Sequence, residues 1–347
     1  MKREVTISAV IPTRDRPEDL ARLLASLRAQ TSPLQEIIIV DAGDGSRTAE
    51  LERVFGDLPL KVLRSSPSVC RQRNLGIRNA GSEFVFLCDD DMEVPPDYLA
   101  AIAGFLKANP GRPIVSGMVA EKDEAGSFRD MPPISARRLV WNYFFMLGVW
   151  CDLRHVKGGG PFGWMASLVR NQFERRGNTE SPAGWPIVGS IREPWFETRF
   201  FGLGASVIRR ELLLENPFDE SLGESGIGDN YDLALRLARF GPITVLTGTR
   251  CRHHRSSSGR PPSSTVYLQR ILALGRFRRI AEKGMRKQRV ALLWSLCGNL
   301  LAFALHGNTE LVRASGKAMA LIWKKRTRVD RTGGTEAGSL EGVTSER

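Results

Sequence analysis

The sequence is poor in cysteine and lacks an apolar segment ahead of its first expected strand. Its 347 residues include 5 cysteines, an odd number without any C-x-x-C spacing, so no disulfide framework is indicated. The N-terminus shows no pattern of a secretory signal. We therefore expect a protein of the reducing cytosol.

The sequence also lacks internal repeats and any recognisable nucleic-acid-binding module, although its net charge is +12. We therefore expect no nucleic acid partner. The positive excess lies largely after Arg250, with cationic runs at 270–289 and 324–328. From Thr332 onward small polar residues dominate without an apolar period, which predicts a disordered tail over 331–347.

Apolar strands alternate with amphipathic helices over the first 90 residues. Residues 6–11 are largely apolar and end at Pro12, and Leu20, Leu23, Leu24 and Leu27 then recur at helical spacing. The expected strands are 6–11, 36–40, 60–63 and 84–88, and the expected helices are 17–30, 48–55 and 69–79. This order predicts an α/β fold with a doubly wound parallel sheet.

Three consecutive carboxylates, Asp89, Asp90 and Asp91, follow the last of these strands. Like charges a few ångströms apart repel by roughly 1 to 4 kcal/mol, so a positive partner is expected. Mg²⁺ or Mn²⁺ prefers oxygen ligands and completes its shell with water and substrate phosphates. The alternative is an acidic turn that leads into Pro95 and Pro96.

Polar residues also follow the first two strands, at Thr13 and at Asp41. Ligands of such sheets bind outside the carboxyl ends of the strands, so these residues and the aspartate triplet are expected to line one crevice. Asp41 either accepts hydrogen bonds from a base or ribose, or caps the helix that follows. A nucleotide-sugar with a metal ion on its diphosphate suits this chemistry.

Several segments resemble, in order and spacing, the family 2 glycosyltransferases of GT-A fold. They are PTRDRP at 12–17, IVD at 39–41, RNLGI at 73–77 with AG at 80–81, FLCDDD at 86–91, GLGASVIRR at 202–210 with FDE at 218–220, and GDNYDLALR at 228–236. The resemblance implies a GT-A domain over 1–255, with a nucleotide-binding half at 1–125 and an acceptor half at 126–255. A helical, membrane-associating appendage at 256–330 would follow.

The resemblance also implies roles for individual positions. The residues expected around the nucleotide-sugar are Pro12, Thr13, Arg14, Asp41, Arg73, Asp89 and Asp90, and Asp91 is the expected principal metal ligand, with Asp89 approaching the ribose or the metal. Of the two adjacent histidines, His254 is favoured over His253 as a further metal ligand. Both histidines could instead be part of a basic surface.

The expected catalytic segment departs from the family pattern, which usually reads Glu-Asp with the Asp as general base. Here Asp229 falls on the Glu and Asn230 on the base, and a neutral amide cannot accept a proton at ordinary pH. The base is then Asp229 or Asp232, the turn is shifted by one residue, or the chain is catalytically weak. We favour Asp229, since Asp232 begins a helix whose macrodipole explains a carboxylate there.

The implied function is an inverting, metal-dependent glycosyltransferase that uses a nucleotide-diphosphate sugar. Its acceptor would be a saccharide or a lipid-linked molecule of cell-envelope polysaccharide or glycolipid synthesis. Transfer to a polyprenyl phosphate is the alternative, because a phosphate nucleophile needs no strong base. A non-catalytic nucleotide-sugar-binding scaffold that kept the fold is a third possibility.

Two apolar stretches remain outside these motifs. The run 290–305 is too short for a comfortable membrane span of around 20 residues, and Asn299 interrupts it. Its cationic flanks and Trp294 fit a helix lying on an anionic inner leaflet, which predicts a peripheral protein on the cytoplasmic face of the plasma membrane. The alternative is a hairpin with 311–323, packed on the catalytic domain. The aromatic stretch 137–150 is a core helix or a flap over the acceptor.

Overall fold

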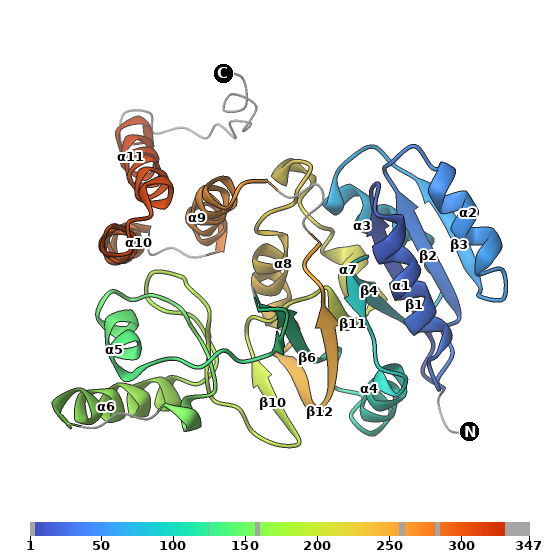
Figure 1. Cartoon of the computed structure of the whole chain (residues 1–347), viewed down its shortest axis with the longest axis horizontal. Coiled ribbons are helices and arrows are strands. Elements are labelled where there is room, and N and C mark those ends of the chain that lie inside the picture. The colour runs from blue at the N-terminus through green and yellow to red at the C-terminus, as the bar shows by residue number, and fades with distance from the viewer. Residues whose placement is uncertain (1–3, 124, 157–159, 257–260, 282–284, 330–347) are drawn as a thin grey trace.

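A mixed sheet of ten strands forms the centre of the computed structural model, which describes residues 4–123, 125–156, 160–256, 261–281 and 285–329 (Figure 1). The predicted tail at 331–347 lies outside the described residues. The strand order is β10-β12-β6-β11-β4-β1-β2-β3, with β5 paired to β12 and β7 to β6. The strands are β1 (Ile7–Thr13), β2 (Glu36–Asp41), β3 (Leu60–Arg64), β4 (Phe84–Cys88), β5 (Met92–Glu93), β6 (Ile114–Lys122), β7 (Phe128–Arg129), β10 (Trp195–Thr198), β11 (Ala205–Arg209) and β12 (Ile243–His253).

Helices cover both faces of this sheet. Those that pack near it are α1 (Pro17–Arg28), α2 (Ser46–Val54), α3 (Val69–Asn79), α4 (Tyr98–Ala108), α7 (Arg210–Glu215) and α8 (Asp229–Leu237). Strands β4, β1, β2 and β3 run parallel, as predicted, and β12 is parallel to β6, whereas β11 runs antiparallel between β4 and β6. The predicted α/β sheet with helices on both faces is confirmed.

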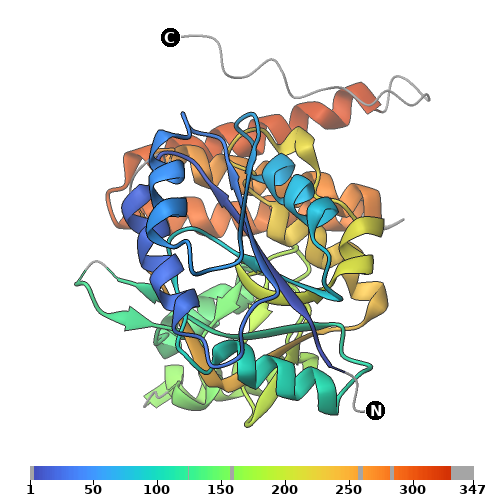
Figure 2. The ribbon, with the colours of Figure 1, turned by 90° about the vertical axis from the view of Figure 1, so that its right-hand side faces the viewer.

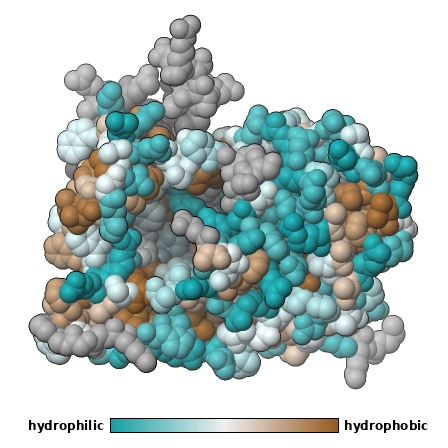
Figure 3. Space-filling model, in the orientation of Figure 1, coloured by the Kyte–Doolittle hydropathy of each residue, from teal (hydrophilic) through white to brown (hydrophobic). Residues whose placement is uncertain are grey.

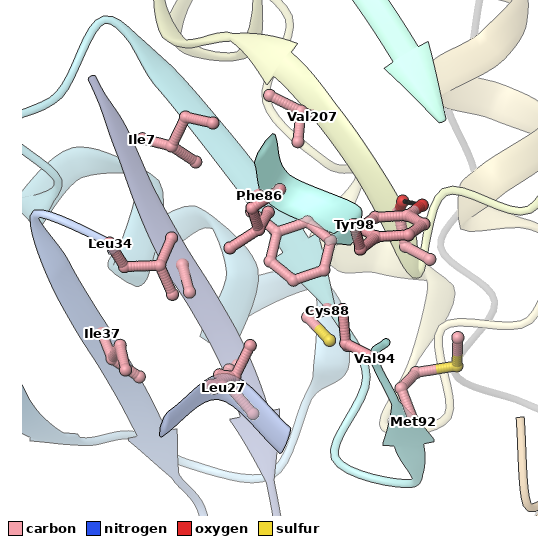
Figure 4. Packing of buried hydrophobic residues seen from close by; sticks show 14 of the residues in the cluster. Ile7, Leu27, Leu34, Ile37, Phe86, Cys88, Met92, Val94, Tyr98 and Val207 are labelled. Carbon is pink, nitrogen blue, oxygen red and sulfur yellow. Dashed lines mark hydrogen bonds between the residues drawn. The ribbon is translucent and has the colours of Figure 1, made fainter. Parts of the chain in front are cut away.

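The alternation of side chains along the strands divides the core into two layers. Ala9 and Ile11 of β1 face the layer that α1 and α4 cover, and Val10 between them faces the layer of α3, α7 and α8. In the first layer Phe86 and Tyr98 lie side by side with ring centroids 5.9 Å apart (Figure 4). On the other face Gly76 lets α3 lie close to β1, since a Cβ there would overlap Val10. Burial on both faces is why these strands are apolar runs rather than alternating ones.

After β7 the chain leaves the sheet, and residues 136–188 form a separate layer. It contains α5 (Ala136–Phe144), α6 (Gly160–Arg176) and a two-stranded sheet of β8 (Val149–Trp150) and β9 (Ile187–Val188). A small core holds it together, with Leu139, Val149, Val169, Phe173 and Ile187 buried. The aromatic stretch 137–150 is therefore a helix and a strand with one face buried in this layer.

The C-terminal region is helical, as predicted. Helices α9 (Ser263–Ala281), α10 (Met285–Leu305) and α11 (Thr309–Val329) pack around Ile271, Leu292, Leu296, Ala318 and Ile322. Figure 2 shows the last helices lying across the top of the molecule. Among the described residues, one stretch, Lys287–Leu305, has the length and apolar composition to cross a membrane, and a third of it is buried.

Candidate active site

The aspartate triplet lies where β4 ends, beside the carboxyl end of β1. The three side chains have different partners, so they are not equivalent. Asp90 is buried, accepts a hydrogen bond from Thr13 Oγ1 at 2.9 Å, and lies 3.2 Å from Arg16 Nη1. Burial raises the pKa of Asp90 to about 7, with Arg16 opposing the shift and Asp91 adding to it. Asp90 thus ties the loop to β1.

Asp91 lies deepest of the three and faces the end of β12. Its Oδ1 is 3.1 Å from Nε2 of His253, and its Oδ2 accepts a hydrogen bond from the backbone N–H of Ser256 at 3.0 Å. The pairing of β5 with β12 brings the two together, because His253 is in register with Met92. Burial lowers the pKa of His253, but its hydrogen bonds to Asp91 and Glu121 outweigh this and raise the pKa to about 9.

His254, the favoured further metal ligand, is placed elsewhere. Its Nε2 is 2.8 Å from Glu93, and its ring lies edge-on to Phe128. The structure therefore brings the imidazole of His253 to Asp91, whereas His254 contributes only its backbone N–H, which donates to the Asp91 carbonyl at 3.0 Å. Adjacent residues at the end of a strand point to opposite sides, so only one of the two histidines can face the crevice. That alternation was a usable signal, but the sequence does not say which residue faces inward.

Arg73 joins the aspartate triplet to the expected catalytic segment. Its Nη2 donates to Asp89 Oδ1 at 2.6 Å, and its Nη1 donates to Oδ2 of Asp229. The guanidinium is 4% exposed and lies over the Phe218 ring at 5.1 Å. Burial by itself would lower the pKa of Arg73. The carboxylates of Asp229 and Asp89 outweigh this effect, so the pKa of Arg73 is raised. One buried cation thus neutralises carboxylates from β4 and α8.

The expected catalytic segment forms the first turn of α8. Asp229 is buried and accepts a hydrogen bond from the backbone N–H of Asn230 at 2.6 Å in addition to that from Arg73. Burial raises the pKa of Asp229 above its usual range, and Arg73 opposes this shift. Asp232 pairs with Arg236 at 2.6 Å one turn along the same helix. Oδ1 of Asn230 is buried and accepts no hydrogen bond from the described residues.

Both carboxylate oxygens of Asp41 accept hydrogen bonds from residues close to the end of β2. Its Oδ1 accepts from the backbone N–H of Gly43 at 2.7 Å, and its Oδ2 accepts from Thr48 Oγ1 at 2.7 Å and Arg64 Nη1 at 2.6 Å. Of the two interpretations given above, this geometry matches the structural one, in which the carboxylate organises the turn before α2. Sequence reasoning did not single out Arg64, which carries the charge that balances Asp41.

The remaining predicted residues lie at the end of β1 or directly after it. Pro12 is buried in β1, in register with Val40. Arg14 is half-exposed and pairs at 2.8 Å with Glu224, which lies in the segment before α8. Gly204 approaches the triplet so closely that a Cβ there would overlap Asp89. The loops before β11 and α8 therefore close one side of the site.

The donor set around the triplet is suited to a hard divalent cation. Among the described residues no group of three or more His, Cys, Asp or Glu side chains forms a ready-made metal cluster. Mg²⁺ is commonly held by only one or two carboxylates together with substrate phosphates and water, and Mn²⁺ also accepts carboxylate ligands. Asp89 and Asp91 can supply those two carboxylates, and His253 lies within reach of Asp91.

Comparison with known proteins supports the family resemblance. Residues 8–169 match the family described as glycosyl transferase family 2. The resemblance to this family is confirmed. An uncharacterized glycosyltransferase, YwdF of Bacillus subtilis (strain 168), is 35% identical over 100 residues, which are 28% of this chain and 37% of the relative. An uncharacterized glycosyltransferase of Haemophilus influenzae is 28% identical over 106 residues, 30% of this chain and 35% of that protein. The matches thus span about a third of these relatives, and Asp229 and His253 lie outside the family match.

Solved structures confirm the GT-A fold. Similar chains include S. aureus TarS 1–349 in complex with UDP-GlcNAc, with a TM-score of 0.52 and 13% identity, over 97% of this chain and 98% of that chain. The structure of GalNAc-T7 with UDP, GalNAc and Mn²⁺ has a TM-score of 0.52 and 15% identity, and the match covers 80% of this chain and 50% of that chain. The mannosyltransferase PcManGT from Pyrobaculum calidifontis, with GDP-Man and Mn²⁺, has TM-score 0.50 and 18% identity, covering 94% and 84%.

Proposed function

We propose that this chain is an inverting glycosyltransferase that transfers a sugar from a nucleotide-diphosphate donor. The observation that carries the proposal is the buried guanidinium of Arg73, which contacts Asp89 of the triplet and Asp229 of α8 at once. A transferase must hold donor and acceptor in line, and this contact fixes the two halves of the crevice relative to each other. The family match and the nucleotide-sugars named in the similar structures support the donor class.

Each residue of the crevice has a proposed part in this reaction. Thr13 and Asp90 brace the loop between β4 and β5, on the side where the nucleotide would lie. Asp89 and Asp91 would hold Mg²⁺ or Mn²⁺, with His253 beside them and His254 in an outer position. Such an ion, when bound, balances the negative charge of the departing diphosphate. The similar structures solved with Mn²⁺ support this choice of metal.

Asp229 is the proposed general base for the acceptor hydroxyl. Its raised pKa brings it closer to the range in which a carboxylate accepts a proton efficiently. Asn230 has no basic atom. Asp232 pairs with Arg236 of its own helix, whereas Asp229 shares Arg73 with Asp89 of the triplet, which places Asp229 nearer the donor.

One observation favours a phosphate acceptor as the second candidate. Both carboxylate oxygens of Asp229 already accept hydrogen bonds, from Arg73 and from the backbone N–H of Asn230, so neither is left open to an acceptor hydroxyl in this structure. A polyprenyl phosphate would need little help from a base, and a lipid-linked acceptor fits the proposed contact of α10 with the inner leaflet. The donor chemistry is the same in both candidates, so they differ only in what attacks the sugar.

Turnover of nucleotide-sugars in three proteins distinguishes these candidates. Wild type, Asp91→Ala and Asp229→Asn are compared for release of nucleoside diphosphate with Mn²⁺, after a thermal-shift screen has identified the donor that stabilises the fold. Asp91→Ala should lose activity by about a thousandfold or more, because binding and charge stabilisation of the diphosphate both depend on it.

Asp229→Asn separates the acceptor classes. A loss of about a hundredfold or more indicates a hydroxyl acceptor, since general base catalysis typically contributes that much. A loss much smaller than that of Asp91→Ala indicates a phosphate acceptor. Stabilisation by donor without any turnover by wild type would contradict the enzyme and leave a nucleotide-sugar-binding scaffold.

A further inference from the structure

Exposed apolar side chains are concentrated in two segments that lie far apart in the sequence. Within the described part of the chain, 14 large apolar residues are exposed, and all but Val54 and Leu214 come from 143–168 or 290–323. Scattered apolar residues on a surface need no explanation, but a concentration of them marks a binding surface. Both segments are therefore candidates for one interface.

The two segments are joined in space through the end of α5. Trp294 of α10 donates from Nε1 to the carbonyl of Phe144 at 2.8 Å and stacks on Phe145 with ring centroids 5.0 Å apart. Gly298 permits this close packing, since a Cβ there would overlap Phe145. Figure 1 shows α10, α5 and α6 below one another along the left edge, where apolar residues gather over α10 and α5 in Figure 3.

Helix α10 is apolar on both its faces but only one face is covered by protein. Leu292 and Leu296 are buried against the neighbouring helices, whereas Val290, Trp294, Leu301 and Leu305 are exposed, Leu305 by 78%. No charged residue occurs between Val290 and Leu305. A helix that is apolar all round is normally covered all round, so the outer face of α10 lacks its cover.

The first half of α6 has the same property. Ala166, Val169 and Phe173 are buried in the layer below, and the opposite side exposes Phe162, Trp164, Met165 and Leu168, with Trp164 exposed by 68%. Arg137 of α5 lies over the Phe162 ring at 5.4 Å, so a cation borders this apolar side. Sequence analysis assigned these residues no membrane part.

Charge identifies the kind of partner. By sequence, α5, α6, α10 and α11 contain 14 Lys and Arg against 2 Asp and Glu, while the rest of the chain has 36 of each. These four helices together therefore carry a net charge of +12, and α9, which packs with α10 and α11, adds four arginines and no acidic residue. A second copy of the chain would bring helices of the same positive charge, whereas an anionic bilayer offers both an apolar interior and opposite charge.

We propose that the exposed side chains of α5, α6 and α10 form one composite face that lies in the surface of an anionic lipid bilayer. The proposal deepens the proposed function, because it rests on the membrane contact of α10 and adds α6 as a second, independent point of attachment. The helix α10 lies in the plane of this surface rather than across it. Its inner side is fixed to protein by Trp185, which donates to Ser295 at 2.9 Å, and by Asn299, which donates to Tyr267 at 3.1 Å.

Co-sedimentation of the full chain with vesicles tests the composite face. Vesicles of phosphatidylcholine alone are compared with vesicles of equal parts phosphatidylcholine and phosphatidylglycerol, at low and high salt. Wild type should bind the anionic vesicles, and less so at high salt because the charges are screened. Trp164→Ser with Leu168→Ser on α6, and Leu301→Ser with Leu305→Ser on α10, should each weaken binding about tenfold or more.

The matched control is Val54→Ser with Leu214→Ser, which removes exposed apolar side chains elsewhere and should bind vesicles as wild type does. Unchanged binding by the α6 variant would overturn the composite face. Self-association of wild type without lipid, lost in both variants, would overturn the bilayer as partner. Thermal stabilisation by donor, measured on the same proteins, reports on the proposed transfer function independently of vesicle binding.

Discussion

The crevice at the sheet edge and the outer face of α10 and α6 are both unfavourable for folding, but for opposite reasons. In the crevice, carboxylates are buried; on the outer face, large apolar side chains are exposed. The crevice compensates internally, since Arg73, Arg16 and His253 bring positive charge to the aspartates. The outer face has no compensation within the described chain. Unfavourable arrangements of this kind are typical of functional sites, and they differ here in whether the protein or a partner relieves them.

Removing the cation of the crevice should have the largest effect on stability. Arg73→Ala leaves Asp89 and Asp229 without their shared partner, and loss of one member of a buried ion pair costs about 3 to 5 kcal/mol. Urea unfolding at neutral pH measures this cost. Arg47→Ala, which removes the exposed partner of Glu50 on α2, is the matched control and should cost less than about 1 kcal/mol. Equal effects of the two variants would contradict the special status of Arg73.

The contact of His253 with Asp91 should stabilise the protein more at low pH than at high pH, because it depends on a protonated imidazole. The folded-state pKa of about 9 exceeds the unfolded value of 6.5, so the stabilisation is fully present below pH 6.5 and is lost as pH rises through about 9. The advantage of wild type over His253→Gln in metal-free buffer should fall by about 3 kcal/mol across that range. Urea unfolding at several pH values checks this, and a constant difference would show that Asp91 does not hold the imidazolium.

The apolar face should be sensitive to packing beneath it rather than to charge. Gly298→Ala forces a methyl group into the ring of Phe145 and should destabilise the contact of α10 with α5 by about 1 to 3 kcal/mol. Gly316→Ala on α11 meets nothing within 4 Å and should stabilise by about 0.5 to 1 kcal/mol through helix propensity. Thermal unfolding measures both changes. Stabilisation by both would mean that α10 does not pack on α5 as described.

Much of the crevice was predictable because its residues directly follow apolar strands. Thr13, Asp41 and Asp89 come at the ends of β1, β2 and β4, and parallel strands bring such ends to one edge. What each residue contacts was not predictable. Asp41 is held by Arg64 and Thr48, and whether it faces a ligand or its own loop depends on a turn that the apolar pattern does not describe.

By itself, the sequence determined the succession of strands and helices and the place of the acidic loop, because burial imposes a period that local residues must follow. Only the tertiary structure decided which charges meet. Arg73 and Asp229 are 156 residues apart, and His253 rather than its neighbour faces Asp91 because of the register between β5 and β12. It likewise decided that α10 packs on the end of α5, where Trp294 stacks on Phe145. Side-chain partners across such distances depend on how the elements pack, and no local period records that.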